Sequence, residues 1–467
     1  MNEATLHFAA LHADDDVRQL ALQGTSEAGV DMPSALQQIA GRQTARQKLP
    51  TWAATDGIVY PPHLNMEQCS SELTARYKAC VAATAGKSAA AADTENDSKT
   101  GGSTFVDLTG GLGVDFYWMS QSFTRRIYAE QSDELCRLAR NNFQALQHDC
   151  DVVCASAEEY VARMEHADMV FIDPARRDQH GARTYGISDC TPDVLALLPM
   201  LAGKAATVVL KLSPMLDWHK AASDVSGTCE VHIVSVRGEC KELLLVVKPG
   251  ADAPDSSSLR LTCANIMADG TAETFVAMGE TPLAYGVAEL SCREKKLSYG
   301  DNFVTCRDNF LSYGDNFVTC RDNFVTHTDN FPNDADGEST ELLFLFEPNA
   351  SVMKGGCFRA LEQCFGVSQL AAGSHLFLSG SPLRGFPGRA FRVVATCSLN
   401  KKDLRAAMAK AGSGEPLTAA NISVRNFPLS ADALRRRLRL RDGGDTYIFG
   451  TTLHDGSHRL FICRKIG

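Results

Sequence analysis

The stretch Thr104-Phe-Val-Asp-Leu-Thr-Gly-Gly-Leu-Gly-Val-Asp115 decides the fold class of this 467-residue chain. Its first apolar residues predict a buried strand, the glycines predict a tight turn, and a helical pattern follows. This order builds a nucleotide-type pocket at the carboxyl end of a strand in an open α/β sheet. If Gly111 and Gly113 are taken as the first two glycines of a dinucleotide fingerprint, Phe116 fills the third position. Asp107 at the strand tip repels a diphosphate and attracts an ammonium group, so we expect a ligand with an amino-acid head.

The following residues continue the pattern of strands that end in polar side chains. Residues 126–130 predict a second strand, and its terminal Glu130 carries a carboxylate that can accept both hydroxyls of a ribose. Ser132 is a good N-cap for the next helix. Further strands are expected at residues 152–154, 169–177 (ending in Asp173-Pro174), 207–212, 230–236 and 242–248. The last two are separated by only five residues, too few for a helical crossover, so they should be antiparallel.

These motifs resemble those of the class I S-adenosylmethionine-dependent methyltransferases. The resemblance rests on Asp107 to Asp115, on Glu130 and on Asp173-Pro-Ala-Arg176, and it covers residues 104–250. It implies an α/β, Rossmann-like sheet with an antiparallel last strand, S-adenosyl-L-methionine as the cofactor, and a catalytic role for Asp173, Pro174 and Arg176. Asp173 would face the methyl group. The residues that it implies in cofactor binding are Asp107, Thr109, Gly110, Gly111, Gly113, Asp115, Glu130, Ser156 and Ala157.

The whole chain is also similar to bacterial methyltransferases that carry a THUMP-like C-terminal domain. The segments that carry this closer match are Glu67-Gln-Cys-Ser-Ser-Glu72, Asp173-Pro-Ala-Arg-Arg177, Glu347-Pro-Asn349 and Val424-Arg-Asn-Phe-Pro428. THUMP modules are associated with RNA modification, so the resemblance implies an RNA substrate, transfer or ribosomal. The role of the segment 67–72 stays open between a lid or substrate wall and ordinary helix packing.

The sequence leaves the methylated atom open. Many amino-methylating enzymes have an aromatic residue after Asp/Asn-Pro-Pro that stacks on a flipped base, and Asp173-Pro-Ala-Arg176 lacks it. The motif also resembles the Asp-Pro-Pro-Arg of uridine-C5 enzymes, which need a cysteine nucleophile after the fifth strand. Lys211-Leu-Ser-Pro-Met-Leu-Asp217 contains no cysteine, which argues against a covalent route.

Composition and charge favour a cytoplasmic enzyme with a polyanionic substrate. The chain has no long apolar run, no secretory signal, and 16 scattered cysteines without a Cys-x-x-Cys pair, so we expect free thiols, no membrane and no metal. The net charge is −10, but residues 341–467 contain 18 Lys and Arg against 9 Asp and Glu, a balance of +9 that leaves −10 − 9 = −19 for the rest. Basic patches hold phosphates. Alternatively, the basic residues simply form the solvent-exposed face of a helix. The expected RNA contacts are Arg177, Lys211, Arg435, Arg436, Arg437 and Arg439.

The expected organisation has five parts. Residues 1–100 form a helical N-terminal domain with a linker, 101–250 the catalytic domain, 251–296 a connecting segment, and 341–467 a basic α+β, THUMP-like domain. Between them, residues 297–310 are repeated without change as 311–324, which indicates a recent tandem duplication. We therefore expect 297–340 to be a dispensable loop insertion that is poorly ordered.

The sequence thus predicts an S-adenosylmethionine-dependent methyltransferase that acts on RNA. Two alternatives remain at this stage. One is an enzyme of the same fold with a protein or small molecule as substrate. The other is a catalytically silent RNA-binding protein that has kept the fold.

Overall fold

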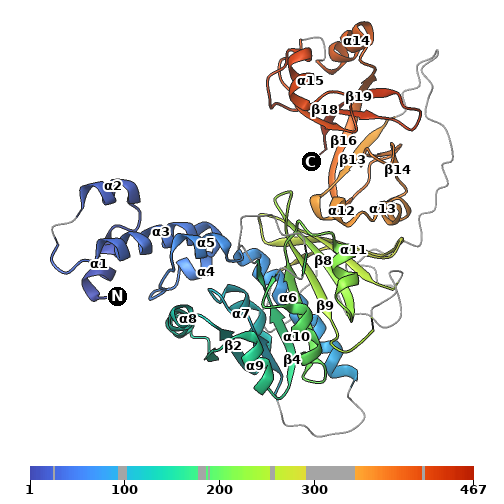
Figure 1. The fold of residues 1–467 in the computed structure, drawn as a ribbon. Helices are drawn as coiled ribbons and strands as arrows, with labels where there is room; N and C mark the ends of the chain where they lie inside the picture. The colour runs from blue at the N-terminus through green and yellow to red at the C-terminus, as the bar shows by residue number, and fades with distance from the viewer. Residues whose placement is uncertain are drawn as a thin grey trace.

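The computed structural model describes residues 1–24, 27–92, 102–176, 186–187, 190–252, 258–290, 342–412 and 416–466. A helical N-terminal region and a C-terminal domain lie on different sides of a central sheet (Figure 1). The linker around residues 93–101 and the duplicated segment 297–340 lie outside the described residues.

The N-terminal region is helical, as the sequence predicts. Helices α5 and α6 are separated by a break at Cys69–Ser71, and α6 begins at Glu72. Ser71 Oγ accepts the backbone N–H of Thr74 at 3.2 Å, which satisfies one of the free amides of the new helix. The helices are α1 (Glu3–Leu11), α2 (Val17–Gln23), α3 (Met32–Lys48), α4 (Pro50–Ala53), α5 (His63–Gln68) and α6 (Glu72–Ala92).

The central sheet has ten strands in the order β12-β11-β10-β8-β9-β7-β4-β1-β2-β3. Strands β3, β2, β1, β4 and β7 are parallel neighbours, whereas β9 lies antiparallel between β7 and β8. The expected antiparallel pair is therefore confirmed. The strands are β1 (Thr104–Asp107), β2 (Arg125–Glu130), β3 (Asp151–Cys154), β4 (Ala167–Ile172), β7 (Ala205–Leu212), β8 (Thr228–Val236) and β9 (Glu239–Val247); a separate short pair is β5 (Ala175–Arg176) with β6 (Cys190–Thr191).

Two apolar cores cover the two faces of this sheet because successive strand residues point to opposite sides. Phe105 and Phe171 join one core, to which α6, α7 and α8 contribute. Val106 and Val170 join the other core, together with α9, α10 and α11. The helices are α7 (Val114–Met119), α8 (Asp133–Ala145), α9 (Ala157–Arg163), α10 (Val194–Leu201) and α11 (Trp218–Asp224). Helix α8 begins after Ser132, whose Oγ accepts the N–H of Leu135, as predicted.

Residues 251–296, expected as a connecting segment, contain three strands that extend the same sheet. They are β10 (Arg260–Ile266), β11 (Thr271–Met278) and β12 (Thr281–Glu289). β10 pairs in parallel with β8, and β11 and β12 follow as antiparallel neighbours. The sheet therefore continues well beyond residue 250, where the catalytic domain was expected to end.

The C-terminal domain has its own seven-stranded sheet in the order β14-β15-β13-β16-β19-β18-β17. Two short helices follow its first strand, and Gly356, which adopts φ +68°, ends the first of them. The strands are β13 (Phe344–Pro348), β14 (Ser368–Gln369), β15 (Phe377–Ser379), β16 (Gly388–Cys397), β17 (Asn421–Arg425), β18 (Thr446–Thr452) and β19 (His458–Lys465); the helices are α12 (Ala350–Gly355), α13 (Phe358–Phe365), α14 (Lys401–Ala411) and α15 (Ala431–Leu438).

Helices α12 and α13 join the C-terminal domain to the central sheet. Val352 of α12 and Leu361 of α13 are buried in the same apolar core as Val231 of β8. Asn349 donates a hydrogen bond to Glu273 of β11 at 3.0 Å, and Lys354 donates one to the backbone oxygen of Leu216 at 2.9 Å. This second contact ties α12 to the loop that follows β7.

Two further expectations concern cysteines and membranes. Twelve cysteines among the described residues are free thiols, whereas Cys364 is disulfide-bonded and so departs from the expectation. Within the described ranges, no helix is long and apolar enough to cross a bilayer.

Candidate active site

The glycine turn after β1 is shaped by the aromatic ring beneath it. A Cβ on Gly110 would lie 2.1 Å from the ring of Tyr128, so only glycine fits there. Gly113 adopts φ +86°, and a Cβ on it would meet Phe143 at 2.6 Å. Tyr128 Oη donates a hydrogen bond to the backbone oxygen of Gly111, which itself has φ +56°. The nearest atom to a Cβ on Gly111 would be the backbone oxygen of Thr109, at an ordinary contact distance of 3.7 Å, so the turn is tightly packed at Gly110 and Gly113 but not at Gly111.

Glu130, at the tip of β2, is fixed beside this turn. Its Oε2 accepts the backbone N–H of Gly111 at 2.9 Å, and its Oε1 accepts the N–H of Ser132 at 2.9 Å. Each carboxylate oxygen has a second lone pair for another donor. The carboxylate is therefore preorganised, with capacity left for two hydroxyl groups.

Asp107, at the tip of β1, is a buried carboxylate with an exposed fraction of only 1%. Its Oδ1 accepts the N–H of Thr109 at 2.9 Å. No ion pair with a lysine, arginine or histidine reaches it from the part of the chain that the structure describes. Burial raises the pKa of Asp107 well above its usual value, against the effect of the Thr109 hydrogen bond, and the carboxylates of Asp115, Asp173 and Glu130 raise it further. Among the described residues, Asp107 therefore has no cationic partner.

Ser156 and Ala157 lie at the next strand tip along this edge. The N–H of Ala155 donates to the backbone oxygen of Glu130, which brings the end of β3 beside the end of β2. Ser156 caps α9 in a reciprocal arrangement with Glu159, and Ala157 is buried at 5% exposure. Both residues therefore lie close to Glu130 at the same edge of the sheet.

Asp173, directly after β4, completes the row of tips. Its backbone N–H donates to Thr109 Oγ1 at 2.7 Å, which joins the tips of β1 and β4. Its side chain is 36% exposed, and Lys211 Nζ of β7 donates to its Oδ2 at 2.6 Å. Burial raises the pKa of Asp173, the Lys211 ammonium lowers it, and Asp115 adds to the rise. Pro174 follows, the backbone of Arg176 lies in β5, and Arg177 is outside the described residues.

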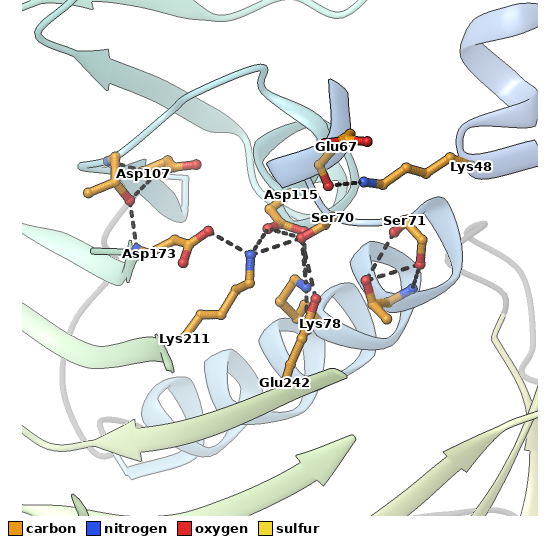
Figure 2. A network of polar contacts seen from close by, with 12 residues as sticks. Lys48, Glu67, Ser70, Ser71, Lys78, Asp107, Asp115, Asp173, Lys211 and Glu242 are labelled. Carbon is orange, nitrogen blue, oxygen red and sulfur yellow. Dashed lines mark hydrogen bonds and ion pairs between the residues drawn. The ribbon is translucent and has the colours of Figure 1, made fainter. Parts of the chain in front are cut away.

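Asp115 takes part in a buried polar network (Figure 2). Lys78 Nζ lies 3.1 Å from its Oδ1, and Lys211 Nζ lies 3.6 Å from its Oδ2. Burial acts to raise the pKa of Asp115, but the two lysines and a hydrogen bond from Ser70 outweigh burial and leave it lowered. Lys78, with no exposed surface, also donates to Glu242 Oε2 of β9. With an exposed fraction of 9%, Asp115 is oriented towards lysines, away from the role expected of it at the glycine turn.

The expected RNA contacts fall into two classes. Lys211 has no N–H left for a phosphate, since its protons face Asp173, Ser70 and Asp115. Arg435 is likewise occupied, by Asp432 at 2.6 Å and Asp442 at 2.7 Å. The remaining arginines at the end of α15 are exposed: Arg436, Arg437 and Arg439.

A neighbouring basic helix adds to this surface. Ala407 of α14 and Leu434 of α15 are buried in one core against the C-terminal sheet. Arg437 donates to the backbone oxygen of Leu399, just before α14, at 3.1 Å. The exposed cations of α14 are Lys401, Lys402, Arg405 and Lys410. We call these four, with Arg436, Arg437 and Arg439, the basic surface.

Comparisons with known proteins agree with this architecture. Residues 388–465 match a family model described as THUMP domain-like, and residues 344–387 match one described as a ferredoxin-like domain. A crystal structure of a candidate methyltransferase from Porphyromonas gingivalis W83 superimposes with a TM-score of 0.71 at 25% identity, covering 99% of this chain and 98% of the other.

Two relatives come from Mycobacterium tuberculosis, strains CDC 1551 / Oshkosh and ATCC 25618 / H37Rv. Both are described as uncharacterized S-adenosylmethionine-dependent methyltransferases and are 23% identical over 362 residues, which is 77% of this chain and 80% of each relative. The chain is an S-adenosylmethionine-dependent methyltransferase with a class I methyltransferase fold, and its residues 388–465 are similar to the THUMP-like family. Its sheet has the antiparallel β9 between β7 and β8 that the resemblance implied.

Sequence reasoning about this methyltransferase missed three members of the polar network: Ser70, Lys78 and Glu242. One signal was present. Lys78 stands three residues after Ala75 and four before Ala82, both fully buried, so it belongs to the apolar face of its helix. A lysine on an apolar face needs a carboxylate partner. Which carboxylate supplies it depends on tertiary contacts that lie 164 residues apart in sequence.

Proposed function

We propose that the enzyme transfers the methyl group of S-adenosyl-L-methionine to RNA in the cytoplasm. The proposal depends most on Asp107, a buried carboxylate without a cationic partner among the described residues. The cofactor carries an ammonium group of the kind this position lacks. The fixed Glu130 carboxylate fits the ribose hydroxyls, and Gly111, which is not tightly packed, would lie along the methionine part.

The proposed site residues divide the work along the sheet edge. Asp107, Thr109, Gly110, Gly111 and Gly113 would hold the methionine end, and Glu130 the ribose. Ser156 and Ala157 would border the adenine. Asp115 would not contact the cofactor; it would hold Lys78 and Lys211 in place. When bound, the cofactor supplies an electrophilic methyl group on a positively charged sulfur.

Asp173 is the residue that we propose to orient the methyl acceptor. A lone pair of the acceptor atom forms the new bond to carbon, and the electron pair of the broken bond stays on sulfur. If the acceptor carries a proton, Oδ1 of Asp173 is the oxygen available to take it, since Oδ2 is held by Lys211. The backbone contact between Asp173 and Thr109 fixes the distance between acceptor and glycine turn.

An RNA substrate is supported by the THUMP-like match and by the basic surface. Its seven cations are exposed, and apart from the Arg437 contact to a backbone oxygen, no hydrogen bond or ion pair of their guanidinium or ammonium groups is seen within the described residues. Exposed cations attract a polyanion and release its counterions, which makes binding depend on salt.

The test combines methylation and binding. Bulk RNA from cells in which the gene is deleted is incubated with tritiated S-adenosylmethionine and the purified enzyme, with RNA from wild-type cells as the control. We expect label in the first RNA and little in the second, since its sites are already methylated. Label in neither, while cofactor binds, would favour a protein or small-molecule substrate; no cofactor binding would favour a silent protein.

A further inference from the structure

Asp173 is held on one oxygen only. Lys211 Nζ lies 2.6 Å from Oδ2, whereas no hydrogen bond to Oδ1 arises from the described residues. A carboxylate fixed on one side presents its second oxygen in a constant direction. The position of Lys211 therefore decides where that second oxygen lies.

Lys211 is in turn fixed by the N-terminal region. Besides Asp173, its ammonium group faces Ser70 Oγ at 3.1 Å and Asp115 Oδ2 at 3.6 Å. Its side chain is only 13% exposed. The ammonium group has three N–H protons and three protein oxygens around it, so rotating it would form no additional hydrogen bond.

Ser70 lies between Lys78 and Lys211 and forms a hydrogen bond with each (Figure 2). Its Oγ has two acceptors for its one proton, Asp115 Oδ2 at 2.7 Å and Glu242 Oε1 at 3.4 Å, and it accepts from Lys211 at 3.1 Å and from Lys78 at 3.3 Å. A hydroxyl has one proton and two lone pairs, so these contacts use it completely. Ser70 lies in the break between α5 and α6, and a continuous helix would not place it there.

The second lysine connects Ser70 to β9, the strand next to β7 in the sheet. Lys78 is fully buried and pairs with Glu242 of β9, which is 4% exposed. The network thus contains the carboxylates of Asp115, Asp173 and Glu242 and two ammonium groups, a surplus of one negative charge. Asp173 is the most exposed of the three acids.

We propose that Lys211 and Ser70 are positioning residues for Asp173, and that the N-terminal helical region thereby completes the catalytic centre. This gives Ser70, within the segment Glu67–Glu72, a role in the reaction. Glu72, the last residue of this segment, links it to α4, because its carboxylate accepts the N–H and the hydroxyl of Thr51 at 2.8 and 2.7 Å. The inference rests on the proposed function of Asp173 in methyl transfer.

The first experiment measures transfer from tritiated S-adenosylmethionine to bulk RNA from the deletion strain. We expect Lys211→Met and Ser70→Ala to lower kcat by about tenfold to a hundredfold, since a displacement of about 1 Å can have that effect. Cofactor Kd, measured by calorimetry, should stay within about threefold. Lys211→Arg should recover part of the rate. The controls are Lys220→Met, an exposed lysine of α11, and Ser71→Ala, which alters only the neighbouring helix start.

The pH profile of kcat separates positioning from a purely structural role. Asp173 is faced by Lys211 and, at longer range, by Lys78, Asp115 and Asp107. Lys211 lowers the pKa of Asp173, so its removal should move the acidic limb of the profile to higher pH. An unmoved limb with kcat within twofold of wild type, or an equal loss in the two controls, would overturn the proposal.

A second experiment needs no RNA, and so distinguishes this inference from the proposed function. Lysine side chains labelled with ¹⁵N are observed by NMR, with Lys211→Arg to assign the signal. We expect the Lys211 ammonium to stay protonated far above the ordinary lysine pKa of about 10.4 and to exchange slowly. Ser70→Ala should speed its exchange. A Lys211 signal that titrates like a free lysine would contradict the network.

Discussion

The two charged regions of this enzyme are built in opposite ways. At the carboxyl edge of the central sheet, charges are buried and paired: Lys78 has no exposed surface and Asp115 is 9% exposed. On the basic surface of the C-terminal domain, the cations are exposed. Asp107 and Glu130 differ from the other acids of the first region, since neither pairs with a cation of the described residues and Asp107 is also fully buried.

The contrast teaches what each kind of charge is suited to do. Buried pairs lie in a medium of low polarisability and have fixed geometry, so they position reacting groups and respond little to salt. Exposed cations are mobile and screened, so they attract a polyanion without fixing its sequence. We therefore expect substitutions in the first region to change cofactor affinity and rate, and substitutions in the second to change RNA affinity and its salt dependence.

The largest effect is expected at Glu130. Glu130→Ala removes the acceptor for the N–H groups of Gly111 and Ser132 as well as the proposed ribose contact. Charge-assisted hydrogen bonds contribute ~1.5–3 kcal/mol each, so calorimetry should find S-adenosylmethionine binding weakened by about a hundredfold. Glu134→Ala, an exposed acid in the first turn of α8, is the matched control. Equal affinities in the two variants would contradict the ribose assignment.

A smaller effect is expected at Asp107, where substitution should make the folded protein more stable. Its raised pKa means that the folded state without ligand holds a proton more tightly than the unfolded state, so stability falls as pH rises above the ordinary aspartate range. Asp107→Asn removes this dependence and keeps the acceptor for Thr109. Urea unfolding should show a gain of ~1 kcal/mol at pH 8 and a smaller one at pH 5.

The same substitution should weaken S-adenosylmethionine binding by about tenfold or more, because the neutral amide cannot form a charge-assisted hydrogen bond with the ammonium group. Asp149→Asn, on the surface, serves as the control for both measurements. A variant that is less stable at pH 8 than wild type, or that binds the cofactor normally, would show that Asp107 is not the countercharge.

The basic surface should affect RNA binding alone. Replacing Arg436, Arg437 and Arg439 by alanine should reduce the slope of log K against log salt by about one for each phosphate that the protein no longer neutralises. Cofactor affinity should not change. The control is Arg435→Ala, because that arginine is already paired with two aspartates. If the triple variant and the wild type had the same salt slope, the basic surface would not be part of the RNA interface.

The smallest effect is expected from deleting residues 311–324, one copy of the exact duplication. Since the segment repeats its neighbour, its removal should leave the unfolding midpoint and S-adenosylmethionine affinity within experimental error. Residues 311–324 shuffled in sequence offer a control of equal length. A marked loss of either property would give the duplication a structural role.

The sequence predicted the catalytic half of the fold well because its signals are local. Periodicity placed β1, β2, β3, β4 and β7, and the five-residue separation predicted the antiparallel β8–β9 pair. The strand-tip acids were found for the same reason, since a tip follows directly from the end of an apolar run. Strands β10–β12 were missed although Asp269-Gly270 is a hairpin signal between two alternating segments.

The remainder was not predictable from local patterns. The break at Ser70 and the pairing of Lys78 with Glu242 depend on contacts between α6 and β9, which are remote in sequence. The same limit explains Lys211 and Arg435, whose charge suggested phosphates. The sequence does not distinguish a lysine or arginine that is free from one that is paired with an acid, because the pairing depends on tertiary contacts.

The most direct test of the proposed cofactor site is a crystal structure of the enzyme with S-adenosylhomocysteine. The account predicts the ribose hydroxyls on the Glu130 carboxylate, the ammonium group beside Asp107, and the sulfur turned towards Asp173. Density for the ligand elsewhere, with Glu130 still bound only to Gly111 and Ser132, would contradict it.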